Sequence, residues 1–210
     1  MLKSCILATA VLTLTGSLPS GYAEENPIAT DAKEASPLKA GVDVPEVSVT
    51  AATGDEITLA SLHEKSPVVL VFFRGGWCPF CTRHTGELIK AYPEIQELGA
   101  DLVGISPDTP ENSKGNAEKN SVPFPLYSDA SLQAARAFGL AFQVDDATLT
   151  KYKGFGIDLE KASGQQHHAL PIPAVYIIDK SGKIVFAHSD PDYRQRLDTK
   201  TIIAELKKLK

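Results

Sequence analysis

The chain has 210 residues, of which 43% are hydrophobic, and its formal net charge is −5. Because the charge balance is mildly acidic and no basic stripe interrupts it, we expect neither nucleic acid nor an anionic membrane surface as a partner. Only three cysteines occur, and Cys5 lies in a segment that we expect to be removed. Cys78 and Cys81 are then the one pair in the mature protein.

The N-terminus has the pattern of a secretory signal peptide. Lys3 gives a positive start, residues 5–18 form an apolar core, and Gly21-Tyr22-Ala23 places small residues where a signal peptidase reads them. The core is too short to cross a bilayer as a helix, which needs about 20 apolar residues. We therefore predict a signal peptide over 1–23, an exported protein (periplasmic or secreted), and no stable membrane association after cleavage.

Two further segments follow the predicted cleavage point. Residues 24–40 are rich in Ala, Pro, Glu and Asp without apolar periodicity, and they predict a flexible leader. Residues 41–210 have the usual length of one domain and are long enough to bury a sizeable core.

The domain opens on a predicted hairpin, because apolar residues alternate with polar ones on both sides of a glycine-containing turn at residues 53–55. Residues 67–73 are a continuous β-branched and aromatic run, typical of a strand buried on both faces. Apolar spacing predicts a helix over 81–98. The remaining predicted elements are, in order, strand 101–106, helix 110–120, strand 124–127, helix 131–138, strands 175–178 and 183–186, and a last helix that opens at Asp198.

Strands that alternate with helices and end in a hairpin and a helix predict a three-layer α/β domain with a mixed central β-sheet and an N-terminal β-hairpin extension. Residues 141–170 fit none of these elements. We interpret them as a loop insertion before the last hairpin.

Cys78 and Cys81 stand at the end of the buried strand and the start of the following helix, in the sequence Trp77-Cys78-Pro79-Phe80-Cys81. A helix N-terminus stabilises a thiolate, the form that attacks peroxides and disulfides. Oxidation of one sulfur to a sulfenic acid can be resolved by the other as a disulfide. The pattern therefore predicts a redox dithiol, with Cys78 as the more exposed and attacking sulfur.

Several neighbours are candidates for tuning the thiolate. Arg74 lowers the thiol pKa if it turns inward, and a solvated arginine at the strand end is the alternative. Trp77 is interpreted either as a substrate-docking surface or as an ordinary half-buried aromatic. Arg83 and His84 on the helix are expected to face solvent. His167 and His168 are expected to be exposed, with approach to the active site as the alternative.

A metal site is the main alternative to redox chemistry at this position. Cys78, Cys81 and His84 supply three candidate zinc ligands, but a helix arranges them poorly for tetrahedral closure. We expect no cofactor and no metal.

The residues Phe73-Arg74-Gly75-Gly76-Trp77-Cys78-Pro79-Phe80-Cys81 resemble the peroxiredoxin-like branch of the thioredoxin superfamily, often labelled AhpC/TSA or redoxin. The segments 103–110, 116–119, 124–129 and 176–184 are also similar to bacterial peroxiredoxins of the bacterioferritin-comigratory type. The resemblance implies a thioredoxin fold and a thiol-dependent peroxidase that reduces hydrogen or alkyl peroxides. A thioredoxin-like or other thiol reductant would then recycle the disulfide.

The chain departs from the peroxiredoxin pattern Pro-x-x-x-Thr-x-x-Cys, where it has Arg74, Cys78 and Cys81 at the three named positions. Pro173 stands where the family has a peroxide-binding arginine, and it resembles the cis-proline of thioredoxins. We therefore expect a cis Ile172–Pro173 bond that faces the dithiol and binds substrate. An exported thiol-disulfide oxidoreductase remains the alternative function, and a copper chaperone using both cysteines and His167 or His168 a more distant one.

Overall fold

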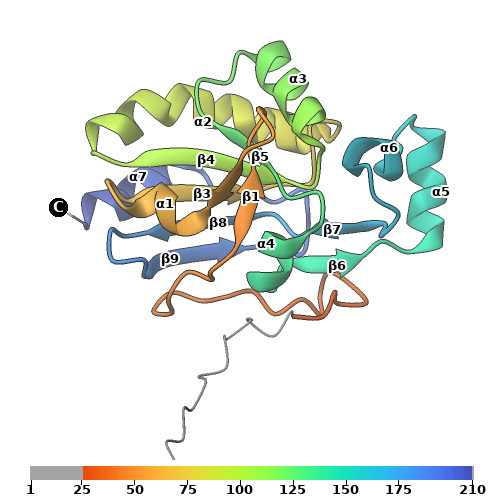
Figure 1. Cartoon of the computed structure of the whole chain (residues 1–210), viewed down its shortest axis with the longest axis horizontal. Helices are drawn as coiled ribbons and strands as arrows, with labels where there is room; N and C mark the ends of the chain where they lie inside the picture. The colour runs from red at the N-terminus through yellow and green to blue at the C-terminus, as the bar shows by residue number, and fades with distance from the viewer. Residues whose placement is uncertain (1–25, 210) are drawn as a thin grey trace, which may run out of the picture.

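A seven-stranded mixed β-sheet forms the centre of the computed structural model, which describes residues 26–209 (Figure 1). The predicted signal peptide and its cleavage site after Ala23 lie outside the described residues. The strand order is β2-β1-β5-β4-β3-β8-β9, and two further strands, β6 and β7, form a separate small sheet. The strands are β1 Ser48–Thr50, β2 Glu56–Thr58, β3 Val68–Phe72, β4 Asp101–Ser106, β5 Leu126–Ser128, β6 Ala141–Gln143, β7 Ala169–Pro171, β8 Ala174–Ile178 and β9 Ile184–Ser189.

Strands β3, β4 and β5 run parallel, whereas β8 is antiparallel to β3 and β9 is antiparallel to β8. The parallel core requires crossover connections, which helices supply. The helices are α1 Leu59–His63, α2 Pro79–Glu97, α3 Pro110–Asn120, α4 Gln133–Ala137, α5 Asp146–Gly154, α6 Leu159–Ser163 and α7 Thr199–Lys207.

The central strand β3 faces a hydrophobic layer on each side, because successive side chains point to opposite faces of a sheet. Val69 and Val71 pack with apolar residues of α2 and α7, such as Leu88 and Ile202. Val68, Leu70 and Phe72, whose side chains point to the other face, pack instead with residues of α1 and α4. Both layers are closed, so the predicted three-layer α/β architecture with a mixed sheet is confirmed.

The N-terminal hairpin is confirmed as well. β1 pairs with β2 in the register Val49↔Ile57, and β1 joins the central sheet through its pairing with β5 at Thr50↔Ser128. The other predicted strands and helices are present with shifts of one or two residues at most ends. α2 begins at Pro79 and runs through Pro93 to Glu97 as one helix.

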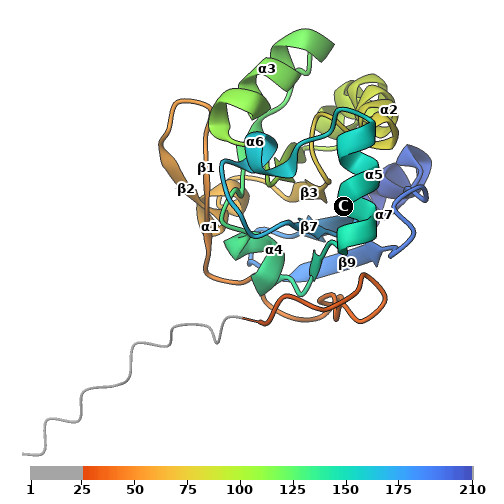
Figure 2. The ribbon, with the colours of Figure 1, turned by 90° about the vertical axis from the view of Figure 1, so that its right-hand side faces the viewer.

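The interpretation of residues 141–170 as a loop is wrong. This insertion contains β6, α5, α6 and β7, and the two helices lie at one side of the molecule (Figure 2). None of the residues of α5 is buried, so the helix has no apolar stripe from which a sequence pattern would reveal it. Asp145 and Asp158 cap the two helices by accepting backbone N–H groups of Thr148 and Lys161.

The predicted flexible leader also differs from the structure over its described part. Residues 26–40 lie along the small sheet and α4, where the backbone of Ala29 pairs with Phe142 and Leu38 N–H donates to the Phe138 carbonyl at 3.0 Å. Ala35 and Leu38 pack on the α4 face of the core. A few small apolar side chains, too irregular for a periodic pattern, are enough to bind this segment to the domain.

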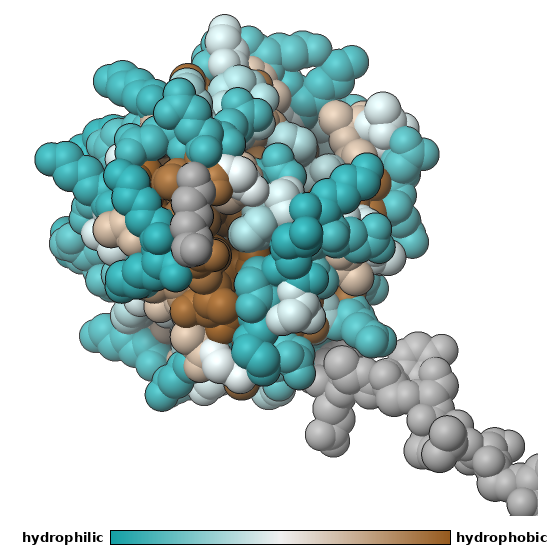
Figure 3. Space-filling model, turned by 90° about the vertical axis from the view of Figure 1, so that its left-hand side faces the viewer, coloured by the Kyte–Doolittle hydropathy of each residue, from teal (hydrophilic) through white to brown (hydrophobic). Residues whose placement is uncertain are grey.

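None of the helices within residues 26–209 combines the length and apolar character needed to cross a membrane. The side of the molecule opposite α5 and α6 carries hydrophilic side chains around a short hydrophobic strip (Figure 3).

Phe138 holds the α4 side of the core together, with its ring centroid 4.9 Å from that of Phe72 and 4.8 Å from that of Tyr176. Phe138→Ala leaves a cavity among buried aromatic rings and is expected to cost about 3–5 kcal/mol of unfolding free energy. Urea denaturation measures the loss. Phe155→Ala is the matched control, since the Phe155 side chain is 78% exposed, and its effect should stay within about 0.5 kcal/mol.

Candidate active site

A tight turn at the carboxyl end of β3 places the dithiol. Gly75 has φ of +141°, a conformation that L side chains rarely adopt. A Cβ atom on Gly75 would stand 2.3 Å from Trp77 Nε1 and 2.7 Å from Asp108 Oδ1, and one on Gly76 would stand 2.7 Å from Asn116 Cγ. Glycine is therefore required at both positions. Gly75 needs it for its backbone angle, and both residues need it because the side chains of Trp77, Asp108 and Asn116 lie too close for a Cβ atom.

Cys78 is the N-cap of α2, and Cys81 lies in the first helical turn. Pro79 occupies the first helical position, where a backbone N–H would have no intrahelical partner. The predicted placement of both cysteines at the start of a helix directly after a buried strand is thus confirmed. Both are present as free thiols.

The exposure of Cys78 was predicted wrongly. Cys78 is 1% and Cys81 is 2% exposed, and both belong to the hydrophobic cluster between the sheet and α2. Trp77 and Phe80 pack against this cluster. Aromatic side chains pack at the N-terminus of α2, where the Tyr193 ring of the β9–α7 loop lies 5.5 Å from the Phe80 ring.

The two thiols have opposite acidities. A hydrogen bond from Cys81 lowers the pKa of Cys78 to about 6, against the opposing effect of burial, and the charges of Arg74 and Arg196 lower it further. Burial raises the pKa of Cys81 well above its usual range, as does its hydrogen bond to Cys78. At neutral pH the arrangement thus favours a thiolate at Cys78 and a protonated thiol at Cys81.

Arg74 turns inward, so the alternative of a solvated strand-end arginine is excluded. It is 3% exposed, and burial lowers its pKa below the usual value although the two cysteines raise it. Its guanidinium lies 5.2 Å from the ring centroid of Trp77, 5.4 Å from that of Tyr152 and 4.1 Å from that of Tyr193. Arg74 also donates a hydrogen bond to the Tyr152 hydroxyl. An aromatic cage therefore holds this positive charge beside the sulfurs.

A second arginine reaches the dithiol from the loop between β9 and α7. Arg196 Nη2 donates to Cys81 Sγ at 3.4 Å. His84, expected to face solvent, is instead buried, and its Nε2 lies 3.1 Å from the carbonyl oxygen of Leu197. Burial lowers the pKa of His84 to about 4. Arg83 does stay at the surface, with its guanidinium 5.3 Å from the Phe80 ring centroid.

Asp108, after β4, holds the glycine turn from the neighbouring strand. Its carboxylate accepts the Gly76 N–H at 2.7 Å and the Ser106 hydroxyl at 3.2 Å. Burial raises the pKa of Asp108 to about 6, although both hydrogen bonds lower it.

A cleft of about 370 Å³ opens beside the turn, between α3 and the insertion. Gly76 and Trp77 form one wall, and Asn112 and Asn116 of α3 face Ile157 and Lys161 across it. Asn112 Nδ2 donates to the carbonyl of Ala162 at 2.8 Å, which ties α3 to α6. The cleft lies next to the residue that precedes Cys78.

The expected cis Ile172–Pro173 bond is wrong, since no peptide bond within residues 26–209 is cis. Pro173 is buried and lines a small cavity with His84 and Arg196. The structure therefore does not support the prediction that Pro173 binds substrate in a thioredoxin-style groove.

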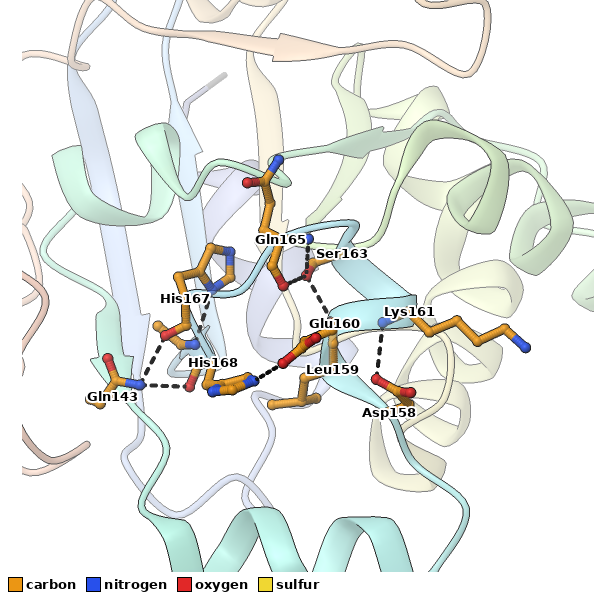
Figure 4. A network of polar contacts seen from close by, with 10 residues as sticks. Gln143, Asp158, Leu159, Glu160, Lys161, Ser163, Gln165, His167 and His168 are labelled. Atoms are coloured by element: carbon orange, nitrogen blue, oxygen red, sulfur yellow. Dashed lines mark hydrogen bonds and ion pairs between the residues drawn. The ribbon is translucent and has the colours of Figure 1, made fainter.

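His167 and His168 serve the insertion (Figure 4). Gln143 Nε2 donates to both of their backbone carbonyls, and His168 Nε2 lies 2.6 Å from Glu160 Oε1. His167 Nε2 is 2.9 Å from the Ala130 carbonyl, and its side chain lines a small cavity behind Arg74. Neither histidine joins the cysteines in a metal site, because residues 26–209 contain no group of three metal-binding side chains.

Tyr152, Asp108 and Arg196 are the site residues that sequence reasoning missed. Tyr152 lies in the unpatterned insertion, and Arg196 lies in a polar loop more than a hundred residues after the cysteines. Asp108 gave one signal, since it follows the strand that neighbours β3 in a parallel sheet, and the carboxyl ends of such strands meet at one edge.

The model of the AhpC/TSA family matches residues 40–187. The chain belongs to the AhpC/TSA family. Peroxiredoxin Bcp of Escherichia coli is 33% identical over 104 residues, which cover 50% of this chain and 66% of that protein. Chloroplastic peroxiredoxin Q of Gentiana triflora is 25% identical over 146 residues, or 70% of this chain and 57% of its own length. The chain thus matches less than two thirds of these AhpC/TSA-type relatives.

Solved structures confirm the thioredoxin-type fold of this AhpC/TSA family member. Peroxidoxin BcpB from Mycobacterium tuberculosis superposes with a TM-score of 0.64 at 23% identity and covers 82% of this chain and 99% of its own. Peroxiredoxin Q from Xanthomonas campestris superposes with a TM-score of 0.62 at 18% identity, with coverage of 80% and 97%.

Asp108→Ala should cost about 1–3 kcal/mol of unfolding free energy, because the Gly76 N–H loses its acceptor. Asp108→Asn keeps an acceptor and should cost less. Urea denaturation measures both, and Asp55→Ala in the exposed β1–β2 turn is the control.

The pH dependence tests the burial of the same carboxyl group, because burial is what raises its pKa. The folded pKa of Asp108, about 6, lies above its ordinary value of 3.8. Its stabilising effect is therefore full below pH 3.8 and is lost as pH rises through about 6. The stability of Asp108→Asn relative to wild type should increase over this interval, and parallel pH profiles would contradict the assignment.

Proposed function

We propose that this protein is a thiol peroxidase that reduces hydrogen peroxide or alkyl peroxides through a Cys78–Cys81 dithiol-disulfide cycle. The observation that carries the proposal is the pair of buried free thiols, Cys78 and Cys81, at the start of α2 with the buried Arg74 just before them in the chain. Hydrogen bonding to Cys81 lowers the pKa of Cys78 to about 6, which favours its thiolate. Membership of the AhpC/TSA family supports the same chemistry.

Cys78 is the attacking sulfur in this proposal. Its thiolate attacks one peroxide oxygen, the O–O bond breaks, and the other oxygen leaves as water or an alcohol after taking a proton. Cys78 is then a sulfenic acid. The Cys81 sulfur attacks it, the S–O bond breaks, and water leaves as the disulfide forms. Cys81 gives up its proton in this second step.

Arg74 supports the first step because its charge stabilises the Cys78 thiolate from within the aromatic cage. Its five N–H donors also suit the developing negative charge on a peroxide oxygen. Trp77 forms the wall between the dithiol and the 370 Å³ cleft, and we assign it to substrate contact. A thioredoxin-like or other thiol donor supplies two electrons to reopen the disulfide.

The alternative functions have less support. The case for a disulfide oxidoreductase rested on Pro173 beside the dithiol, expected with a cis bond, and on the absence of the peroxiredoxin Thr and Arg. The Ile172–Pro173 bond is trans, which removes the expected cis bond from this case. The case for a copper chaperone required a histidine beside the cysteines, and His167 and His168 make their contacts with Ala130 and Glu160 instead.

We also propose that residues 1–23 direct export and are removed, which leaves a leader from residue 24 and the domain from residue 41. The apolar core at 5–18 and the small residues before Glu24 support this. Expression of the whole chain in a bacterium should yield a periplasmic protein that begins at Glu24, as read by mass spectrometry of the cell fractions. Retention of Met1 in the cytoplasmic fraction would contradict export.

The cysteine assignment is tested with Cys78→Ser and Cys81→Ser. Each reduced variant is treated with hydrogen peroxide, and sulfenic acid is trapped over time. Cys81→Ser keeps a donor for the Cys78 thiolate and should react at least tenfold faster than Cys78→Ser. The double variant is the control for background oxidation.

Two outcomes would overturn parts of this proposal. Rapid sulfenic acid formation in Cys78→Ser but not in Cys81→Ser would move the attacking role to Cys81. If wild type and both single variants react no faster than a free thiol, the peroxidase function itself fails.

A further inference from the structure

Two positive charges, the buried Arg74 and the half-buried Arg196, face the sulfurs without a carboxylate between them. Among the ion pairs of residues 26–209, neither Arg74 nor Arg196 is joined to an Asp or Glu side chain, and the Nε atom of each is buried without a hydrogen-bond partner. A buried charge is costly unless an opposite charge compensates for it. The Cys78 thiolate does so in the reduced protein, and Cys81 does so whenever it carries a negative charge.

Each arginine acts mainly on a different sulfur. The charge of Arg74 lowers the pKa of Cys78 more than that of Arg196 does. Arg196 donates directly to Cys81 Sγ, and its charge lowers the pKa of Cys81, whereas Arg74 lowers that pKa through a backbone hydrogen bond. Cys78, Arg74 and Arg196 are the ionisable groups that face Cys81 from α2, the β3–α2 turn and the β9–α7 loop.

The loop that carries Arg196 is fixed at its next residue. His84 lies one turn after Cys81 on α2, and its Nε2 contacts the Leu197 carbonyl at 3.1 Å. His188 of β9 and Arg196 are the charged or titratable groups that face His84. The contact joins α2 to the loop immediately behind the guanidinium. The same loop places the Tyr193 ring 5.5 Å from that of Phe80.

We propose that Arg196 is a catalytic residue for reopening the disulfide, in which it stabilises Cys81 as the leaving thiolate, and that His84 is the positioning residue for Arg196. The inference rests on the dithiol cycle proposed above, and it adds a second arginine that acts when the disulfide is reduced. Arg74 serves the sulfur that attacks peroxide, and Arg196 serves the sulfur that leaves.

The step balances as a thiol-disulfide exchange. A donor thiolate attacks Cys78 Sγ, the Cys78–Cys81 bond breaks, and Cys81 leaves with the electron pair beside Arg196. A second donor thiolate attacks the mixed disulfide, forms the donor disulfide and releases Cys78 as a thiolate. Cys81 then takes a proton from water. A leaving thiol of lower pKa leaves faster, so the guanidinium accelerates the first exchange.

The test measures the acidity of Cys81 in a Cys78→Ser background, which needs neither peroxide nor a disulfide. The rate of alkylation by iodoacetamide is followed against pH. Adding Arg196→Gln should raise the midpoint by about one pH unit. Arg194→Gln is the matched control, because Arg194 lies two residues away in the same loop and pairs with Asp192 at the surface. It should leave the midpoint unchanged.

The positioning role is tested at His84 in the same background. His84→Leu removes the contact with Leu197 and should shift the midpoint in the direction of Arg196→Gln. His84→Gln offers an amide N–H to the same carbonyl and should restore most of the wild-type value. If His84→Leu fails to fold, the comparison of His84→Gln with Arg196→Gln still decides, since the proposal requires a smaller shift for the first.

The exchange itself is measured in the chain with both cysteines. Trp77 is the single tryptophan of the protein, so its fluorescence reports reduction by dithiothreitol beside Cys78. Arg196→Gln should slow reduction about three- to tenfold, and Arg194→Gln should not. An unchanged Cys81 midpoint in Arg196→Gln, or equal shifts in both arginine variants, would overturn the proposal. Failure of peroxide turnover alone would affect only the peroxidase function.

Discussion

The glycine turn after β3 is the constraint on which the site depends. It must pass between the Trp77 indole and the Asp108 carboxylate, where a Cβ atom on Gly75 has no room. The turn sets where α2 begins, and the start of α2 sets where both sulfurs lie. Asp108 comes from the neighbouring parallel strand, so the pairing of β3 with β4 is part of the active-site geometry.

A hydrogen bond and two arginine charges set the acidities of the two thiols. The hydrogen bond between the two thiols lowers the pKa of Cys78 and raises that of Cys81, which separates the acidities of two chemically identical groups. Arg74 and Arg196 supply the positive charges that lower the pKa of Cys78, and aromatic rings rather than carboxylates surround Arg74. A carboxylate partner would neutralise the guanidinium and weaken its effect on the thiolate.

The insertion at residues 141–170 contributes side chains to the candidate active site. Tyr152 of α5 contacts both Arg74 and Trp77, with its ring centroid 5.7 Å from that of the indole. α6 is joined to the start of α3 through the Ala162 carbonyl, which also accepts the Thr109 N–H at 2.9 Å. The insertion therefore closes the aromatic cage on one side and shapes the neighbouring cleft on the other.

The sequence by itself determined the order along the chain of the strands of the large sheet and of helices α2, α3, α4 and α7, because continuous apolar runs and helical spacing mark buried elements. It also determined the position of both cysteines at a helix start after β3. These features depend on neighbours within a few residues, where periodicity and backbone sterics act directly.

Only the tertiary structure decided which distant side chains meet the sulfurs. Arg196, His84 and Tyr152 reach the site through loop packing that leaves no periodic trace, and α5 buries none of its residues. The burial of Cys78 and the trans bond at Pro173 also differ from the sequence-based expectation. Each depends on side chains packed from remote segments, and local patterns contain no information about these contacts.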